Sequence, residues 1–175
     1  MKRLALIILI LAVLIILVVL VIGLMLPAKH SVTRSIHLKQ TPEAVFAVLD
    51  DRTNLPSWSS GIAKVEPLPD RDGKPVARYT LKWGGMQMLA TELDRTPPHR
   101  LVTAMGKDDG SSFGTWTYEI RAEGEGCRIS ITENGELKNP LFRTMARLRG
   151  LDATINQTLS DLAKKFGETA AIQRD

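Results

Sequence analysis

Two glutamates are the residues whose types and positions could carry acid–base chemistry in this chain. Glu133 continues the inward side of a strand that alternates from Cys127, and Glu92 lies on the same side of its strand as Met86 and Met88. A carboxyl group held in an apolar cavity has a raised pKa and can act as a general acid or base. The alternative is that a strand end or a bulge returns each side chain to water, and the rarity of unpaired buried glutamate favours it.

Other chemistry finds little support. His30 falls in a linker, His37 on the outward side of a strand and His99 in a turn, so all three are expected at the surface. No cysteine and histidine spacing suits zinc, and the aspartate-rich loops lack the further ligands of a calcium loop, so they are interpreted as hairpin turns. The serine pairs at residues 59–60 and 111–112 have no histidine nearby in sequence. We therefore expect no metal and no cofactor.

The first 26 residues differ in kind from the rest of the chain. From Leu4 to Leu26 the chain runs for 23 residues without a charge, and such a helix is roughly 34 Å long, enough to cross a bilayer. A cleaved signal would have a shorter apolar run and small residues at a cleavage site. The run ends in Met25-Leu26-Pro27-Ala28, without that pattern and without a cysteine for a lipid anchor. An uncleaved membrane anchor is the favoured interpretation.

The orientation of this anchor follows from few charges. Lys2 and Arg3 precede the apolar run, and Lys29, Arg34 and Lys39 follow it, so the positive-inside count is nearly balanced. A very short basic N-terminus ahead of a long apolar run usually stays in the cytoplasm. We expect a single-pass protein of the cell membrane with its C-terminal domain on the extracytoplasmic side.

The rest of the chain is large enough for one domain with a real core. Without Lys2 and Arg3, residues 27–175 hold 21 basic residues against 19 acidic ones, a net charge of +2. This small excess does not indicate a domain that binds nucleic acid. The single Cys127 excludes an intramolecular disulfide. The expected divisions are a basic N-terminus at 1–3, a transmembrane helix at 4–26, a linker at 27–30, the domain at 31–167 and a tail at 168–175.

Local patterns place a strand and a short helix at the start of this domain. Residues 31–39 alternate as a half-buried strand does, with Val32, Arg34, Ile36 and Leu38 on one side. The sequence Thr41-Pro42-Glu43 then begins a helix, because threonine caps it and proline suits its first position. We expect this helix to end near residue 50.

A run of strands and one long helix complete the pattern. Turn sequences separate strands that follow a first one from Ile62, and close spacing without intervening helices predicts an antiparallel meander. The later strands are expected at residues 77–83, 86–94, 101–105, 115–121 and 127–133, with the turn before 115 at residues 107–110. Apolar residues from Leu141 to Phe166 recur at helical spacing, so we expect a single helix that begins after Asn139 and ends at Gly167. Gly150 lies inside it, where a kink is plausible.

These elements resemble the START-like or Bet v 1-like superfamily, also called SRPBCC or polyketide cyclase/dehydrase-like. The resemblance covers about residues 31–167. It is carried by the strand at 32–38 with Thr41-Pro42-Glu43-Ala44-Val45-Phe46, by Leu55-Pro56-x-Trp58, Val65-Glu66, Leu93-Asp94-x-x-Pro97-Pro98-x-Arg100-Leu101 and Thr115-Trp116-Thr117-Tyr118, and by the last helix. It implies an α+β helix-grip fold, in which a curved antiparallel sheet of about seven strands wraps around a long C-terminal helix. It also implies a hydrophobic cavity between sheet and helix.

The alternation of the strands suggests which side chains line that cavity. The same positions could equally be ordinary packed core, and apolar residues at strand spacing usually are. Methionine suits irregular ligands but also fills gaps in cores, and Trp58 could be a lid over the core. The candidate lining residues are Phe46, Trp58, Tyr79, Trp83, Met86, Met88, Met105, Trp116, Tyr118, Ile129, Ile131, Met145, Leu148 and Ile155.

Three functions remain open at this point. The leading hypothesis is a membrane-anchored domain that binds or carries a lipid or another apolar small molecule, such as a polyketide-like compound, and is not an enzyme. The second is a cyclase or dehydratase that uses Glu133 or Glu92 as its base. The third is a protein-interaction module with a filled core beside a membrane partner.

Overall fold

A computed structural model describes residues 2–108 and 112–174. The predicted turn at residues 107–110 and the serine pair at 111–112 lie partly outside the described residues. The chain forms two compact units, and each is built from two stretches of sequence. We call Met1–His30 with Glu136–Leu151 the helical unit, and Ser31–Gly135 with Asp152–Asp175 the sheet unit.

The sheet unit is an α+β structure with eight strands, one more than expected. Their order is β2-β3-β4-β5-β6-β7-β1-β8. Strands β2 to β7 form the predicted antiparallel meander, and the last of them, β7, lies beside the first strand of the chain, β1. The additional strand β8 lies in the predicted tail, where Gln173 pairs with Ser35 and Arg174 with Arg34. The strands are β1 Lys29–Leu38, β2 Ile62–Arg71, β3 Lys74–Leu81, β4 Gln87–Thr96, β5 Arg100–Gly106, β6 Ser112–Glu123, β7 Gly126–Glu136 and β8 Gln173–Arg174.

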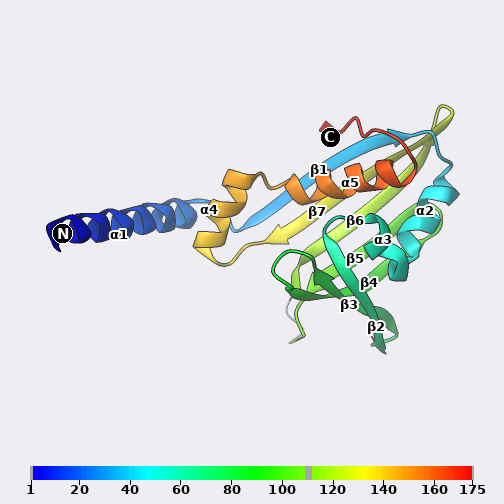
Figure 1. The fold of residues 1–175 in the computed structure, drawn as a ribbon. Coiled ribbons are helices and arrows are strands. Elements are labelled where there is room, and N and C mark those ends of the chain that lie inside the picture. The colour runs from blue at the N-terminus through cyan, green and yellow to red at the C-terminus, as the bar shows by residue number, and fades with distance from the viewer. Residues whose placement is uncertain (1, 109–111, 175) are drawn as a thin grey trace. The chain divides into compact units, whose positions relative to one another are not determined.

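The helices of the sheet unit lie over one face of the sheet (Figure 1). They are α2 Pro42–Asp50, the 3-10 turn η1 Arg52–Asn54, α3 Leu55–Trp58 and α5 Ala153–Lys165. The predicted cap of α2 is present, because the Thr41 side chain accepts a hydrogen bond from the Ala44 N–H at 3.3 Å. At the start of α5, the Arg34 guanidinium donates to Asp152 at 2.6 and 3.0 Å and so holds α5 to β1.

The main core fills the space between α2, α5 and strands β1, β5, β6 and β7. Burial of these side chains is the principal stabilising contribution, at about 25 cal/mol per Å² of apolar surface. A smaller cluster of Ala77, Tyr79 and Ala90 lies on β3 and β4. The main cluster consists of Ile36, Leu38, Val45, Phe46, Leu49, Leu101, Ile120, Cys127, Ile129, Ile131, Ile155, Leu159, Leu162 and Ala163.

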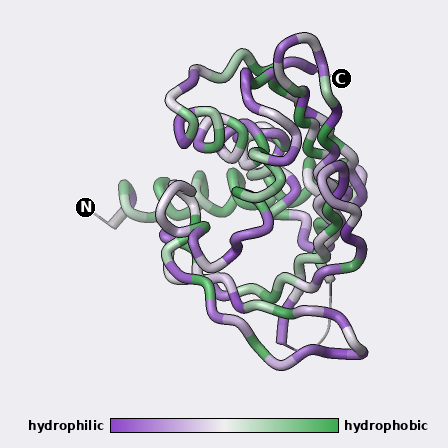
Figure 2. Tube along the Cα trace, turned by 90° about the vertical axis from the view of Figure 1, so that its right-hand side faces the viewer, coloured by the Kyte–Doolittle hydropathy of each residue, from purple (hydrophilic) through white to green (hydrophobic). Residues whose placement is uncertain are grey.

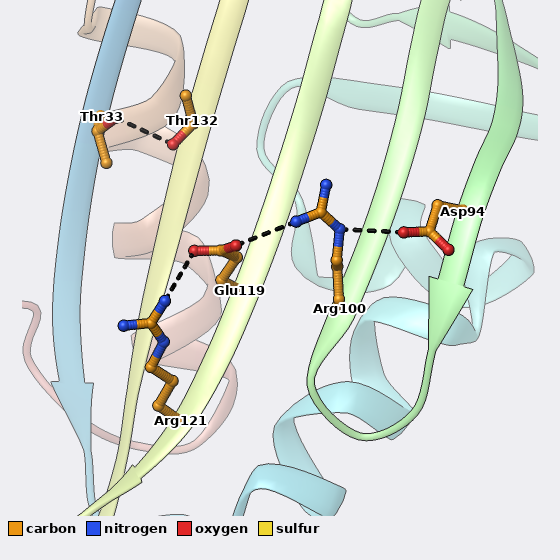
Figure 3. A network of polar contacts seen from close by, with 6 residues as sticks. All are labelled: Thr33, Asp94, Arg100, Glu119, Arg121 and Thr132. Atoms are coloured by element: carbon orange, nitrogen blue, oxygen red, sulfur yellow. Dashed lines mark hydrogen bonds and ion pairs between the residues drawn. The ribbon is translucent and has the colours of Figure 1, made fainter.

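The opposite face of the sheet is polar (Figure 3). There Arg100 donates to Asp94 at 3.0 Å and to Glu119 at 3.2 Å, and Arg121 donates to the other oxygen of Glu119 at 3.4 Å. These side chains are 38–80% exposed, so the ladder faces solvent. The sheet therefore has one polar face and one face available for a core and a cavity.

The single long C-terminal helix that we predicted is two helices. α4 spans Pro140–Arg149, and α5 starts at Ala153. The interruption falls at Gly150, whose φ of 93° lies in a region that other residues rarely adopt. Asn139 caps α4 as expected, accepting from the Leu141 N–H at 2.9 Å. Only α5 belongs to the sheet unit.

The helical unit pairs α4 with α1, which spans Lys2–Met25. Figure 2 shows that α1 is hydrophobic along its length, and residues Arg3–Met25 are long and apolar enough to cross a membrane. The two helices touch at Gly23, where an added Cβ would lie 2.0 Å from the Pro140 carbonyl oxygen. The Thr144 hydroxyl donates to the Val19 carbonyl oxygen at 2.9 Å.

Candidate functional site: a cavity in the sheet unit

The sheet unit contains a partly open cavity of about 350 Å³ between α5 and the sheet. Strands β2 to β7 form one wall, α5 forms the other, and α2, η1 and α3 contribute further lining residues. This volume falls at the small end of the range of ligand pockets. The lining residues are Leu49, Arg52, Leu55, Trp58, Ser59, Gly61, Ile62, Tyr79, Leu81, Met88, Leu101, Thr103, Met105, Phe113, Trp116, Tyr118, Glu133, Thr154, Gln157, Thr158 and Asp161.

Aromatic and thioether side chains dominate the sheet wall. Trp116 and Tyr118 are two residues apart on β6, so strand alternation turns both to the same side. Their ring centroids lie 6.1 Å apart at an interplanar angle of 48°, a tilted arrangement typical of aromatic pairs. Met88 on β4 and Met105 on β5 continue this wall. It offers an adaptable apolar surface to a ligand.

Two tyrosines bring hydroxyl groups to this apolar wall. Burial raises the pKa of Tyr118, and the neighbouring Tyr79 raises it further. Burial likewise raises the pKa of Tyr79. Both phenols are therefore neutral around pH 7 and able to donate a hydrogen bond.

Arg52 is the cationic residue of the lining, and it is already paired. Its guanidinium, on η1, hydrogen-bonds to Glu92 of β4, and the two side chains are only 13% and 14% exposed. Glu92 is not part of the cavity lining. The pair joins η1, which contributes to the lining, to strand β4. Glu92 therefore acts as a counter-ion rather than as the free carboxylate of the enzyme hypothesis.

Asp161 is the buried carboxylate of the α5 wall. It accepts hydrogen bonds from the Ser60 N–H and the Ser60 hydroxyl, both at 2.7 Å, and from the Gln157 side chain at 2.9 Å. A carboxylate satisfied by three donors is a structural tie, here between α5 and the start of β2. This tie fixes the distance between the helix and the edge of the sheet.

One buried donor in the lining has no partner within the described part of the chain. The indole N–H of Trp58, in the α3 turn, is buried without a hydrogen bond. Buried indole groups usually find an acceptor.

Seven of the predicted residues lie in the cavity wall. That these side chains contact a ligand, or that Glu133 acts on one, stays a prediction. They are Trp58, Tyr79, Met88, Met105, Trp116, Tyr118 and Glu133.

Four predicted lining residues are at the surface instead. Trp83 is 82% exposed and Met86 59% exposed, because β3 ends at Leu81 and both fall in the turn before β4. Met145 is 56% and Leu148 78% exposed, because the helix break at Gly150 places them on α4 in the helical unit. The predicted types of these elements were correct, but the predicted positions of their ends were not.

Four others belong to the packed core. Phe46 is 5% exposed, and Ile129, Ile131 and Ile155 are fully buried in the main cluster, without a place in the cavity lining. The cavity lies beside this cluster. The predicted inward direction was therefore correct, while the assignment to the cavity was not.

Sequence reasoning missed the polar half of the lining. Arg52 and Ser59 lie in short turns without periodicity. Thr103, Gln157 and Asp161 are polar residues at inward positions, which the search for apolar stripes passed over. The helical spacing of Gln157 and Asp161, four residues apart, was the available signal. Among residues 2–108 and 112–174, no group of three histidine, cysteine, aspartate or glutamate side chains is placed to hold a metal ion.

Comparisons with known proteins agree with this architecture. The Zhui aromatase/cyclase from a Streptomyces species superposes with a TM-score of 0.62 at 13% identity, covering 78% of this chain and 93% of the other. A START superfamily protein from Mycobacterium smegmatis gives 0.58 at 14% identity, covering 78% and 99%. The di-domain aromatase/cyclase BexL gives 0.62 at 14% identity, and the match covers 81% of this chain but only half of BexL. At these identities the likeness concerns the fold alone.

Sequence comparison gives the family directly. No curated protein matches the chain in sequence. A family model described as polyketide cyclase / dehydrase and lipid transport matches residues 29–167, from β1 to just beyond α5. The match spans both the strands and the helix that enclose the cavity. The chain therefore belongs to the polyketide cyclase / dehydrase and lipid transport family.

Proposed function

We propose that the sheet unit binds an apolar small molecule or lipid in its cavity, and that α1 anchors the chain in a membrane. The observation that carries the proposal is the cavity of about 350 Å³ with an aromatic and methionine wall. Burying apolar ligand surface there contributes about 25 cal/mol per Å². The membership of a family that includes lipid transport supports the same class of ligand.

The polar groups of the cavity restrict the chemistry of this ligand. Tyr79 and Tyr118 are neutral donors on one wall, and the Arg52 guanidinium has N–H groups beyond the one that Glu92 occupies. A ligand oxygen that accepts a hydrogen bond fits between them. We infer a mostly apolar molecule that carries a carbonyl or a similar acceptor.

The contacts of α1 favour a retained anchor over a cleaved signal. Thr144 bonds to Val19, and α4 packs directly on Gly23, so α4 has a packing partner in the last turns of α1. Removing α1 would expose this surface of α4. A single-pass anchor with the sheet unit on the extracytoplasmic side also agrees with the short basic N-terminus.

Glu133 supports an enzyme as the second candidate function. It lines the cavity, and its charge is one of the influences that raise the pKa of Tyr118. A carboxylate beside a neutral phenol could abstract a proton from a carbon next to a ligand carbonyl while the phenol donates to that carbonyl oxygen. Turnover of a carbonyl ligand that Glu133→Gln abolishes, with binding retained, would establish this activity.

Native mass spectrometry of the full chain tests the binding proposal. The protein is purified from membranes in detergent, freed of its detergent micelle in the gas phase, and its mass is measured. The same preparation is also extracted with organic solvent. We expect a small apolar molecule bound at one per chain and recovered in the extract. A chain mass without adduct, together with an extract that matches the detergent blank, would contradict the proposal.

A further inference from the structure

We propose that α4 is an interfacial helix, which inserts its exposed apolar side chains into the membrane surface at which α1 ends. This inference rests on the proposed anchoring by α1 and adds a second membrane contact to it. The partner is the lipid surface itself. The evidence comes from the contacts between α1 and α4, from the exposed side of α4, and from its charge.

The contacts fix α4 at the C-terminal end of α1. The Thr144 hydroxyl donates to the Val19 carbonyl oxygen at 2.9 Å, and Thr144 itself is only 4% exposed. Gly23 has no side chain at the point where Pro140 approaches it. In a membrane-spanning α1, residues 19–26 occupy about the last 10 Å of the span, from the outer acyl chains to the head groups. α4 therefore lies at this same depth.

Arg143 joins the same two helices through the backbone. Its Nη1 donates to the Gly23 carbonyl oxygen at 3.0 Å and to the Leu26 carbonyl oxygen at 3.2 Å, where the last carbonyls of α1 have no partner within the helix. Its Nε donates to the Leu137 carbonyl oxygen at 2.6 Å. A guanidinium that caps a helix end in this way belongs at the head-group level, where its charge stays hydrated.

The side of α4 that does not contact α1 is apolar and exposed. At about 100° per residue, its four large side chains occupy an arc of about 120°. Such an arc in contact with water would be unfavourable, whereas lipid would cover it and continue the apolar surface of α1. The four residues are Leu141 (42% exposed), Phe142 (63%), Met145 (56%) and Leu148 (78%).

The charge of this segment suits an anionic lipid surface. Residues 137–151 contain Lys138, Arg143, Arg147 and Arg149 and no acidic residue. Basic residues beside an apolar stripe of phenylalanine and leucine are typical of helices that lie in the membrane interface. Basic residues close to an anionic lipid surface are attracted to it. Lipid is therefore favoured over a protein partner for this side of α4.

Spin labels measure the depth of α4 in the full chain, reconstituted in vesicles of three parts phosphatidylcholine to one part phosphatidylglycerol. Labels are placed by Phe142→Cys and Leu148→Cys, with Glu125→Cys in the exposed β6–β7 turn as the water-exposed control and Ile15→Cys as the anchor control. The native Cys127 is fully buried, and its uptake of label is measured as a blank in the unmodified chain. Collision rates with oxygen and with a water-soluble nickel chelate report the depth.

The inference predicts labels at 142 and 148 about 5–10 Å below the head groups, with an oxygen-to-nickel collision ratio about five-fold or more above that at 125. Nickel collision at 142 equal to that at 125, with the label at 15 inside the bilayer, would overturn the inference and leave the anchor standing. Labels shielded from both reagents at 142 would identify a protein partner and also overturn it. A water-exposed label at 15 would overturn the anchor and the inference together.

Discussion

Arg52 and Glu92, 40 residues apart in sequence, form an ion pair beside the cavity, and both side chains are largely buried. Because the pair lies between η1 and β4, it connects the η1 part of the cavity lining to the sheet. The pair holds the Glu92 carboxylate outside the cavity lining. This relationship favours a structural role for Glu92, and its use as a general base stays a prediction.

Replacing Glu92 by leucine should therefore destabilise the fold. Glu92→Leu leaves the Arg52 charge buried and unpaired, and we expect the free energy of unfolding to fall by about 3 kcal/mol. Urea unfolding of the full chain in detergent measures it. The matched control is Glu66→Leu, which removes an exposed ion pair with Lys64 and should have a much smaller effect. Equal losses from the two variants would contradict the structural role of Glu92.

The Arg34–Asp152 pair predicts a pH dependence of stability. The hydrogen bonds from Arg34 lower the pKa of Asp152 below the ordinary value of 3.8 for an aspartate. A lowered folded-state pKa contributes stability above the unfolded value, and this contribution is lost as the pH falls through the folded value. The stability difference between the wild type and Asp152→Asn should thus be constant at neutral pH and shrink below about pH 4. Urea unfolding across this range checks it, and a difference that grows in acid would contradict it.

Gly150 distinguishes the observed pair of helices from a single long one. If Gly150 lay within a continuous helix, Gly150→Ala would stabilise the protein by about 1 kcal/mol. Because its φ is 93°, we expect the substitution to destabilise by about 1–3 kcal/mol. Thermal or urea unfolding gives the sign. Gly61→Ala is the control, since its nearest neighbour would be the Ser59 hydroxyl at 3.9 Å.

The Tyr118 hydroxyl should select ligands that carry an acceptor. Displacement of the fluorescent probe 1-aminoanthracene compares 2-acetylnaphthalene with 2-ethylnaphthalene, which lacks the carbonyl. Tyr118→Phe should weaken the ketone about five-fold, as for one hydrogen bond of about 1 kcal/mol, and leave the hydrocarbon unchanged. Because burial raises the pKa of Tyr118, the preference of the wild type should persist to about pH 10. An equal loss for both compounds would show that the hydroxyl has no such role.

The sequence predicts most of this fold because its signals are local. The cap at Thr41, the start of α4 after Asn139 and the alternation of β6 each depend on a few neighbouring residues, and the structure contains all three. Periodicity of apolar residues continues past the end of β3 at Leu81 and past the break at Gly150, so it marks neither boundary. For that reason Trp83 and Leu148 were assigned to the interior, although both are exposed.

The cavity was less predictable than the fold. Alternation tells which side of a strand is buried, and it correctly turned both Tyr118 and Ile131 inward. It does not tell whether α5 packs against that side or stands away from it, and this distinction separates the cavity lining from the core. The Arg52–Glu92 pair depends on a contact between distant segments, which the residue pattern of a single sequence does not reveal.

The most direct test of the central claim is whether filling the cavity abolishes ligand binding. Thr103 is 4% exposed and lines the cavity, so Thr103→Phe places a ring inside it, whereas Thr117→Phe introduces the same ring on β6 outside the lining. Energy transfer from tryptophan to 1-aminoanthracene is measured for the full chain in lipid nanodiscs, with thermal unfolding as a check of folding. The account predicts saturable binding at one probe per chain in the wild type and in Thr117→Phe, and its loss in a folded Thr103→Phe. Equal binding by all three, or none by the wild type after solvent extraction of bound lipid, would contradict it.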